Sequence, residues 1–410
     1  MKCFRSVIKP GVKNAKPRDR LHKPEDDGWS GGGDVRQDRG GYCRAMLKRN
    51  EFVDTFSDEA RHKRGDRSNT ARAAIGLLAI LLVLTMLFSL TAGASDASAL
   101  GLVKHWLFPS MEELSQRDRI IVMDIRLPRI ILGVLIGAGL AVSGAVMQGL
   151  FRNPLADPGL IGISSGASLG AVSVIVLGGS VLAPVAAIFG IFTLPVVAFL
   201  GSLISTFLLH GIATRRGQTS VATMLLAGIA LTALGMALTG ALIYMADDRQ
   251  LRDLTFWQLG SLAGATWTKI AASGPIIALA LVAAPFLARG LNGLALGEAS
   301  ANHLGIPVQR LKNIAIVTVA AAVGASVAMS GGIGFVGIVV PHLLRLVIGP
   351  DNRYLLPASA LLGAILLLLA DAVSRTIVAP AELPIGIVTA LAGAPFFLWI
   401  LLRRRGIVDL

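Results

Sequence analysis

Charged residues are scarce in this chain. They account for 15% of its 410 residues and hydrophobic residues for 54%, whereas a soluble domain carries about a quarter charged residues. The charges also gather between apolar runs of roughly twenty residues, the length that crosses a bilayer as a helix. This composition excludes an ordinary soluble domain and predicts an all-α protein that crosses a membrane many times.

Cysteine is nearly absent as well. Only Cys3 and Cys43 occur, both in the polar N-terminal segment and outside any CxxC or metal-ligand spacing. A disulfide framework and a cysteine metal site are therefore not expected, and no cofactor is predicted.

The chain also lacks the parts of a self-powered transporter. No G-x-x-x-x-G-K-[ST] phosphate loop occurs, so nucleotide hydrolysis by that route is excluded. An ion-coupled carrier is expected to bury acidic groups near the middle of the membrane. Asp157 and Glu298, however, fall in predicted loops, and Asp371 falls near a helix end. The energy for any transport is therefore expected to come from another subunit.

The net charge of +13 is concentrated near the N-terminus, because residues 1–72 hold 18 Lys/Arg against 11 Asp/Glu. A pI near 10.4 therefore fits a basic cytoplasmic face against anionic lipid and does not indicate a nucleic-acid partner. Dense mixed charge, scattered proline and a glycine run predict that residues 1–70 form a disordered cytoplasmic tail, with Met46 as an alternative start. Residues 71–405 are predicted to form the transmembrane domain.

The apolar runs predict ten spans. They lie near residues 73–92, 128–150, 159–178, 186–212, 220–245, 270–288, 311–330, 333–349, 355–374 and 385–402. With a cytoplasmic N-terminus, sixteen of the Lys/Arg from residue 61 onward fall inside and nine outside, which is the orientation that the positive-inside rule favours. An even number of spans then places both termini in the cytoplasm.

Two long connections are predicted to be partly helical. The outer segment 246–269 contains DDRQLRDLTFWQLG, which is typical of a short amphipathic helix at the membrane surface. The inner segment 288–312 has leucine and alanine at helical spacing, punctuated by Gly297 and Gly305, and predicts two short helices with a kink between them. Such a helix pair usually docks a partner, and a plain loop between spans is the alternative.

Three arginines are expected on the outer side of the membrane. Arg126 and Arg129 lie at the start of the second predicted span, where cations oppose the helix macrodipole. Arg375 lies at the outer end of the ninth, with Asp371 four residues earlier as its expected ion-pair partner. They form either a docking patch for an acidic partner or anchors for lipid headgroups, partly neutralised by Asp124. Their occurrence on separate elements favours the patch.

Small residues dominate the segment 126–170, RLPRIILGVLIGAGLAVSGAVMQGLFRNPLADPGLIGISSGASLG. They predict helices whose backbones pack closely together. The segment also contains two G-x-S-x-G matches, centred on Ser164 and Ser168. A serine hydrolase would need a histidine base within reach, and none of the six histidines is expected in the middle of a span. Close packing is the favoured interpretation, and an intramembrane serine hydrolase is a remote alternative.

Six motifs together resemble one known family. They are IRLPR, GAGLAVSGAVMQGLFRNPLADPGLIG, LALGEASANHLGI, GGIGFVGIVVPHLLRL, LLLADAVSR and ELPIGIVTALAGAPFFLWILL, spread over roughly residues 73–405. The chain resembles the FecCD-type permeases of ATP-binding-cassette importers for iron–siderophores, haem and cobalamin, and within that family it looks most like the haem branch.

The resemblance implies a type II ABC importer permease in the bacterial inner membrane. Its expected partners are a second copy of the chain, two copies of a cytoplasmic ABC ATPase, and a periplasmic substrate-binding protein. The family pathway runs along the dimer axis and is lined chiefly by the fifth and tenth spans, here residues 221–245 and 385–402. The 70-residue tail has no counterpart in the family pattern.

The resemblance also implies roles for individual residues. Arg126, Arg129 and Arg375 are expected to dock the binding protein. Asn153 and Leu155 are expected to belong to a cytoplasmic gate. The expected ATPase-coupling positions are Gly297, Glu298, Leu304 and Gly305.

The predicted function is the membrane subunit of an ATP-driven importer that moves haem or another iron complex from periplasm to cytoplasm, without being an enzyme. A ferric siderophore or cobalamin is the alternative cargo. A secondary carrier driven by an ion gradient is a more distant alternative.

Overall fold

The structure is a computed structural model that describes residues 67–92, 116–215 and 218–403. These residues belong to one compact unit, residues 66–410. The tail predicted for residues 1–70 lies almost entirely outside the described residues and stays a prediction.

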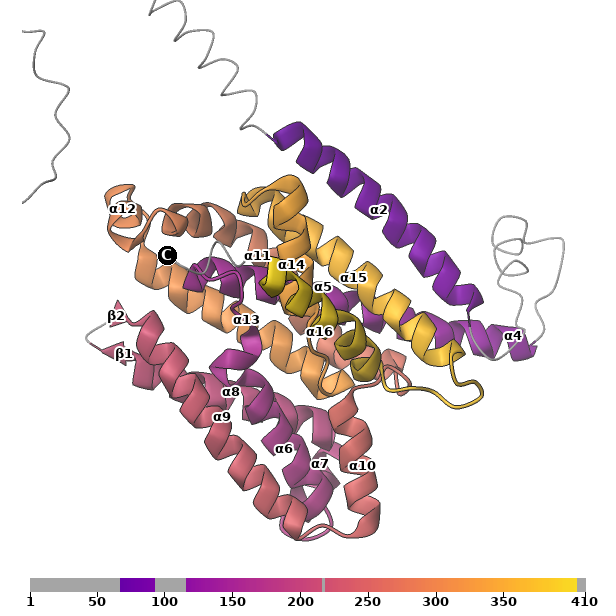
Figure 1. The fold of residues 1–410 in the computed structure, drawn as a ribbon. Helices are drawn as coiled ribbons and strands as arrows, with labels where there is room; N and C mark the ends of the chain where they lie inside the picture. The colour runs from indigo at the N-terminus through magenta and orange to yellow at the C-terminus, as the bar shows by residue number, and fades with distance from the viewer. Residues whose placement is uncertain (1–66, 93–115, 216–217, 404–410) are drawn as a thin grey trace, which may run out of the picture. The chain divides into compact units, whose positions relative to one another are not determined.

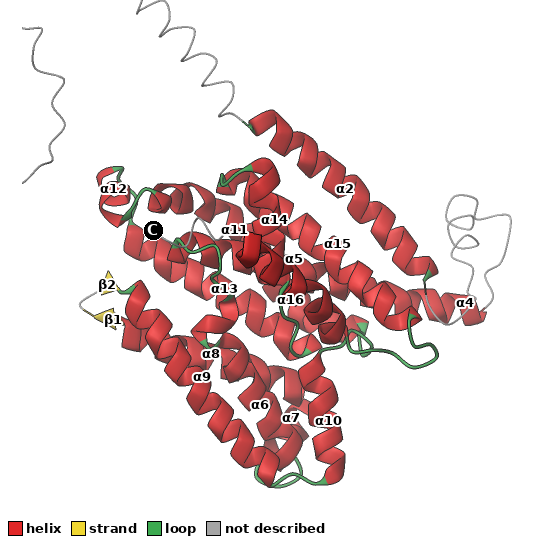
Figure 2. Ribbon diagram, in the orientation of Figure 1, coloured by secondary structure: helices red, strands yellow, loops and turns green. Residues whose placement is uncertain are grey.

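The described part of this unit is helical apart from one hairpin of two short strands (Figures 1 and 2). In chain order the elements are α2 (Ser68–Thr91), α4 (Gln116–Ile120), the π-helix η1 (Ile121–Arg126), α5 (Leu127–Phe151), η2 (Pro158–Ile161), α6 (Ile163–Leu177), α7 (Ala183–Phe189), η3 (Gly190–Phe192), α8 (Thr193–Ala213), β1 (Thr214–Arg215), β2 (Gln218–Thr219), α9 (Val221–Tyr244), α10 (Asp248–Leu259), α11 (Trp267–Ala295), α12 (Glu298–His303), α13 (Val308–Ser330), α14 (Val336–Ile348), α15 (Asn352–Thr376) and α16 (Ile385–Arg403). The strands β1 and β2 pair antiparallel.

Each of the ten predicted spans coincides with an apolar helix among the described residues. Seven helical stretches are long and apolar enough to cross a membrane, and three shorter apolar helices, α6, α14 and α16, occupy the remaining predicted positions. The all-α polytopic fold is therefore confirmed. The expected amphipathic helix is α10, whose start is fixed by a capping box between Asp247 and Gln250.

Helix α5 lies at the centre of the bundle and packs against α15, α11, α13 and α14 (Figure 1). Its glycines allow this approach, because a Cβ atom on Gly137 would lie only 2.5 Å from the carbonyl oxygen of Gly363 in α15. Gly144 meets the backbone of Gly337 in α14 even more closely. The predicted close packing of small residues is confirmed for this helix.

The second predicted span begins where α5 does, at Leu127, but the helix that contains it is longer than predicted. The helix that contains Arg126 and Arg129 already begins at Gln116, because α4, η1 and α5 are continuous. In the π-helical turn the Leu127 N–H donates to the Val122 carbonyl, and this wider turn precedes Pro128, which has no N–H to donate. The two arginines therefore lie inside a helix, and the expected conflict with the macrodipole does not arise.

The predicted end of the sixth span is also too early. Helix α11 continues to Ala295 through Pro285, so only α12 is a separate short helix within residues 288–312. The break between them falls at Gly297, whose φ of 107° is accessible to glycine but strained for other residues. The predicted kink is therefore present, although one of the two predicted helices is the end of α11.

Candidate functional site

Two of the three arginines predicted on the outer side bind one carboxylate. Arg129 binds Asp371 with its Nη2 at 2.9 Å from Oδ1, and Arg375 binds the other oxygen of Asp371 with its Nε at 3.1 Å. The expected pair of Asp371 with Arg375 is therefore confirmed. The Asp371 side chain is 1% exposed, so a single buried carboxylate connects α5 to α15.

Two of these arginines also hold the C-terminal end of α2. Arg375 donates to the Ala92 carbonyl at 2.9 Å and to the Ser89 hydroxyl at 2.8 Å, and Arg126 donates to the Leu90 carbonyl. Since the last carbonyls of a helix lack partners within the helix, cationic side chains are well suited to this end.

The cluster is more enclosed than the sequence suggested. Arg126, Arg129 and Arg375 are only 4–6% exposed. Glu382 is not among the residues predicted from the sequence. It precedes α16 and forms a two-point ion pair with Arg129 at 2.8 and 3.0 Å. Its side chain is 39% exposed and offers the most accessible part of the ion-pair network. The signal was the acidic residue that opens the ELPIG motif.

The four predicted coupling positions surround α12 at the opposite end of the molecule. Gly297 and Gly305, with φ of 107° and 76°, bound this short helix. Glu298 opens it, and Leu304 directly after it is 63% exposed. A short helix between two glycines with an exposed leucine has the form of a surface contact element.

The two predicted gate residues lie in the turn that follows α5. Arg152 ends the helix in the left-handed conformation, and the Asn153 Oδ1 then accepts a hydrogen bond from the Leu155 N–H at 2.9 Å. This local Asx-type bond stabilises the turn. Leu155 is exposed.

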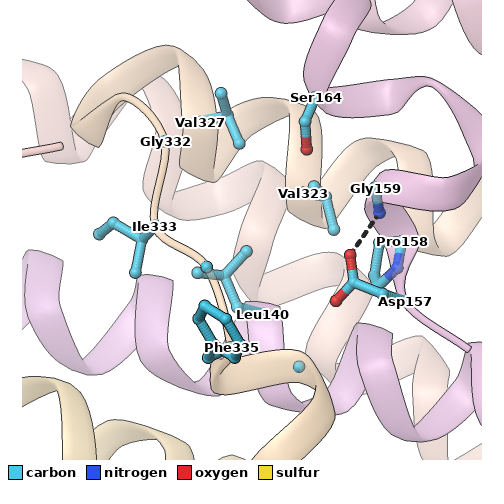
Figure 3. A pocket seen from close by; sticks show the side chains of 12 residues that line it. Leu140, Asp157, Pro158, Gly159, Ser164, Val323, Val327, Gly332, Ile333 and Phe335 are labelled. Atoms are coloured by element: carbon cyan, nitrogen blue, oxygen red, sulfur yellow. Dashed lines mark hydrogen bonds between the residues drawn. The ribbon is translucent and has the colours of Figure 1, made fainter. Parts of the chain in front are cut away.

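The carboxylate of Asp157 faces a cavity of about 210 Å³ that is also lined by Leu140, Ser164 and Val323 (Figure 3). One oxygen accepts a hydrogen bond from the Gly159 N–H at 2.7 Å. Leu140 lies near the middle of α5, so Asp157 lies at the depth of the middle of a span. Asp157 does lie in a loop, as predicted, but this loop packs beside the middle of α5 rather than beyond its end.

The length of the neighbouring helices explains this depth. Helix α6 has 15 residues and α14 has 13, or about 22 and 20 Å at 1.5 Å per residue. Both are shorter than a hydrocarbon core of about 30 Å. The segments that precede them therefore enter the membrane region, where irregular backbone occurs only against protein or a cavity.

The serines of the G-x-S-x-G matches lie on α6, which packs closely on α8. Gly166 of α6 contacts the backbone of Gly201, and the Ser205 hydroxyl donates to the Gly162 carbonyl at 2.9 Å. These contacts are those of a packing surface. His342 lies in the middle of α14, so the expectation that no histidine is found inside a span is wrong.

Helices α9 and α16 leave part of their apolar surface exposed in the single chain. Only Met224, Gly228 and Gly235 are buried in α9, whereas its Leu226 and Met236 are about 70% exposed. Leu391 and Trp399 are similarly exposed on α16. No group of three potential metal ligands occurs among the described residues.

Known proteins resemble this chain over most of its length. The model of the FecCD transport family matches residues 81–403. The hemin transport system permease protein HmuU of Yersinia pestis is 46% identical over 336 residues, which is 82% of this chain and 96% of that protein.

Two further relatives carry a different name. The cobalamin import system permease protein BtuC of Halobacterium salinarum is 44% identical over 287 residues. The match covers 70% of this chain and 74% of that protein. The vitamin B12 import system permease protein BtuC of Salmonella typhi is 44% identical over 328 residues. That match covers 80% of this chain and 94% of the relative.

A solved structure has the same fold. It is an inward-facing conformation of a putative metal-chelate type ABC transporter, with a TM-score of 0.70 and 33% sequence identity. The match covers 81% of this chain and 99% of that one.

Proposed function

The chain belongs to the FecCD transport family, and on that premise we propose that it moves haem from the periplasm to the cytoplasm as the membrane subunit of an ATP-driven importer. It is a multi-pass permease subunit of an ABC importer for haem, a siderophore or cobalamin rather than an enzyme, and ATP hydrolysis belongs to a separate subunit. The observation that favours haem is the 46% identity with the hemin permease over nearly its whole length.

The ligand can be tested on the partner that delivers it. We expect the substrate-binding protein that serves this permease to bind haem, and to give a Soret band shifted from that of free haem. Cyanocobalamin and a ferric siderophore serve as competitors in the same titration. Saturable binding of either competitor, without haem binding, would assign the importer to that ligand instead.

The proposed assembly is a homodimer in the bacterial inner membrane with both termini in the cytoplasm. Two copies would face each other through α9 and α16, and the pathway would run between them. The support is that most of α9 and part of α16 leave apolar side chains exposed within one chain. Two cytoplasmic ABC ATPases and a periplasmic binding protein complete the proposed complex.

The arginine cluster is the proposed docking site of the binding protein. In the single chain, its accessible carboxylate is Glu382, bound to Arg129. A carboxylate of the binding protein would approach the same edge and share these guanidinium groups. Charge complementarity of this kind raises the association rate and orients the partner, and it contributes less to the affinity.

Replacing Arg126 by glutamine is therefore expected to weaken association of the binding protein about two- to fivefold, chiefly through a slower and less salt-dependent association rate. Glutamine is preferred to glutamate, because a buried negative charge facing the Leu90 carbonyl would disturb the end of α2. Surface plasmon resonance on permease in nanodiscs measures the rates at several salt concentrations.

The matched control is Arg289→Gln, which removes one positive charge from an exposed position on the predicted cytoplasmic side. It should leave association unchanged. Association of the Arg126→Gln variant at the wild-type rate and with the wild-type salt dependence would rule out docking through this residue.

At the other end, α12 is the proposed contact of the ATPase. Its support is the exposed Leu304 beside Glu298, in a helix bounded by Gly297 and Gly305. Closure of two ATPases around ATP would move this short helix, and the bundle would exchange between outward-open and inward-open states. Asn153 and Leu155 would belong to the gate at this side.

A further inference from the structure

A buried lysine joins three segments beside the proposed ATPase contact. Lys312, on the second turn of α13, is 3% exposed. Its Nζ lies 2.8 Å from Glu298 Oε1 in α12 and donates to the Thr219 carbonyl in β2, also at 2.8 Å. The ammonium group therefore connects α12 to the hairpin between α8 and α9 through a single side chain.

The hairpin end of this connection has little freedom. Gln309 lies three residues before Lys312, on the same face of α13, and its Oε1 accepts a hydrogen bond from the Thr219 N–H at 3.0 Å. Its amide nitrogen donates to the Thr219 hydroxyl at 2.5 Å. Both backbone polar groups of Thr219 are therefore bound by side chains of α13.

Thr219 in turn determines where α9 begins. The next residue, Ser220, is the N-cap of α9, and its hydroxyl accepts a hydrogen bond from the Thr223 N–H at 3.3 Å. A displacement of Thr219 must therefore displace the first turn of α9, which is one of the two helices proposed to line the pathway.

The opposite end of the connection lies on a movable element. Glu298 is the first residue of α12, and this helix is separated from α11 and α13 by Gly297 and Gly305. Glycine in the left-handed region permits rotation of such an element at low steric cost. The Glu298 side chain is 43% exposed, whereas its lysine partner is buried.

Stability alone gives a poor account of a lysine at this position. Removing a charge from water is costly, and replacing a buried ion pair by apolar side chains of similar volume is often neutral or stabilising. What only a charged donor provides here is a link of fixed length between Glu298 and the Thr219 carbonyl.

We infer that Lys312 is a positioning residue for transport, which transmits movement of α12 to the start of α9 through its contacts with Glu298 and Thr219. This role rests on the proposed function, in which the ATPase contacts α12. It assigns to Lys312 the coupling of ATP hydrolysis to opening of the pathway, and it requires no contact of Lys312 with the transported ligand.

The experiment compares the wild-type complex with Lys312→Met, a change that keeps the length of the side chain and removes its charge. Permease, ATPase and binding protein are reconstituted in liposomes, and ATP hydrolysis and uptake are measured in the same preparation. We expect uptake per ATP to fall by at least about fivefold, the lower end of typical coupling between sites, while hydrolysis stays within about twofold of wild type. Lys312→Arg, which keeps the charge and several donors, should restore most of the ratio.

Lys269→Met is the matched control, since Lys269 lies at the start of α11 on the predicted outer side. It should leave uptake per ATP unchanged. A wild-type ratio in an assembled Lys312→Met complex would overturn the inference. A wild-type complex with no ATP-dependent uptake would instead contradict the proposed function, so the two failures are distinguishable.

A second variant covers the case in which Lys312→Met does not assemble. Glu298→Gln keeps a hydrogen-bond acceptor for Lys312 but removes the ion pair, and we expect it to lower uptake per ATP at least twofold. Spin labels at Asn302→Cys and Ala222→Cys, with Cys3 and Cys43 replaced by serine, report the distance between α12 and α9. On ATP binding the distribution of this distance should stay narrow in the wild type and should broaden in Glu298→Gln. Identical distributions with an unchanged ratio would overturn the inference.

Discussion

Replacement of Asp371 by leucine is expected to destabilise the folded chain by about 3–5 kcal/mol, the usual loss when one partner of a buried ion pair is removed. Asp371 is 1% exposed and balances the charges of both Arg129 and Arg375. Without it, two guanidinium groups remain in a site with little access to water, close to the ends of α2, α5 and α15. We expect most of the protein to be lost during purification.

Thermal unfolding in detergent, followed by size-exclusion chromatography, measures this effect. Asp253→Leu makes the same chemical change at an exposed position on α10 and should alter stability by less than about 0.5 kcal/mol. Arg129 keeps its ion pair with Glu382, whereas Arg375 loses its ion-pair partner. In the double variant Asp371→Leu, Arg375→Met, that charge is removed as well, so part of the lost stability should return. An Asp371→Leu protein as stable as wild type would show that Asp371 does not hold the cluster together.

Much of the fold could be predicted from the sequence because membrane spans follow from the length of apolar runs. The ten spans, the surface helix α10 and the close packing of α5 through Gly137 and Gly144 depend on local composition, which is visible in the chain. The helical extension from Gln116 to Arg126, which precedes α5, could not be predicted in this way. It depends on a π-helical turn before Pro128, and apolar composition carries no signal for such a turn.

The arginine cluster was predictable in its members and not in its environment. The charge of Arg126, Arg129 and Arg375 and their positions near the ends of predicted spans are readable from the sequence. Their burial depends on Glu382 and on the end of α2, which approach from distant parts of the chain.

The burial of Lys312 could not be predicted from the sequence either. In the sequence Lys312 is one of several positive charges on the predicted inner side. The positive-inside rule is enough to explain a positive charge there. Its burial follows only from the hairpin β1–β2 and from α12, which meet on one face of α13. Contacts between segments far apart in sequence carry this information.

Asp157 has a direct bearing on how transport is powered. The structure places this carboxylate beside the middle of α5, next to the N-terminal turn of α14 and a cavity. Ionisable groups at such positions, beside interrupted helices, are typical of carriers driven by ion gradients. The separation of this chain from its energy source is therefore the claim that most needs a direct measurement.

That measurement is uptake into liposomes that contain either this chain alone or the chain with its ATPase and binding protein. The ligand of the binding protein is supplied outside, and a haem-binding protein enclosed in the liposomes traps what enters. We predict accumulation only for the complete complex with ATP, and none for the chain alone under an imposed proton or sodium gradient. Gradient-driven accumulation by the chain alone, abolished in Asp157→Asn, would contradict the account and identify a self-powered carrier.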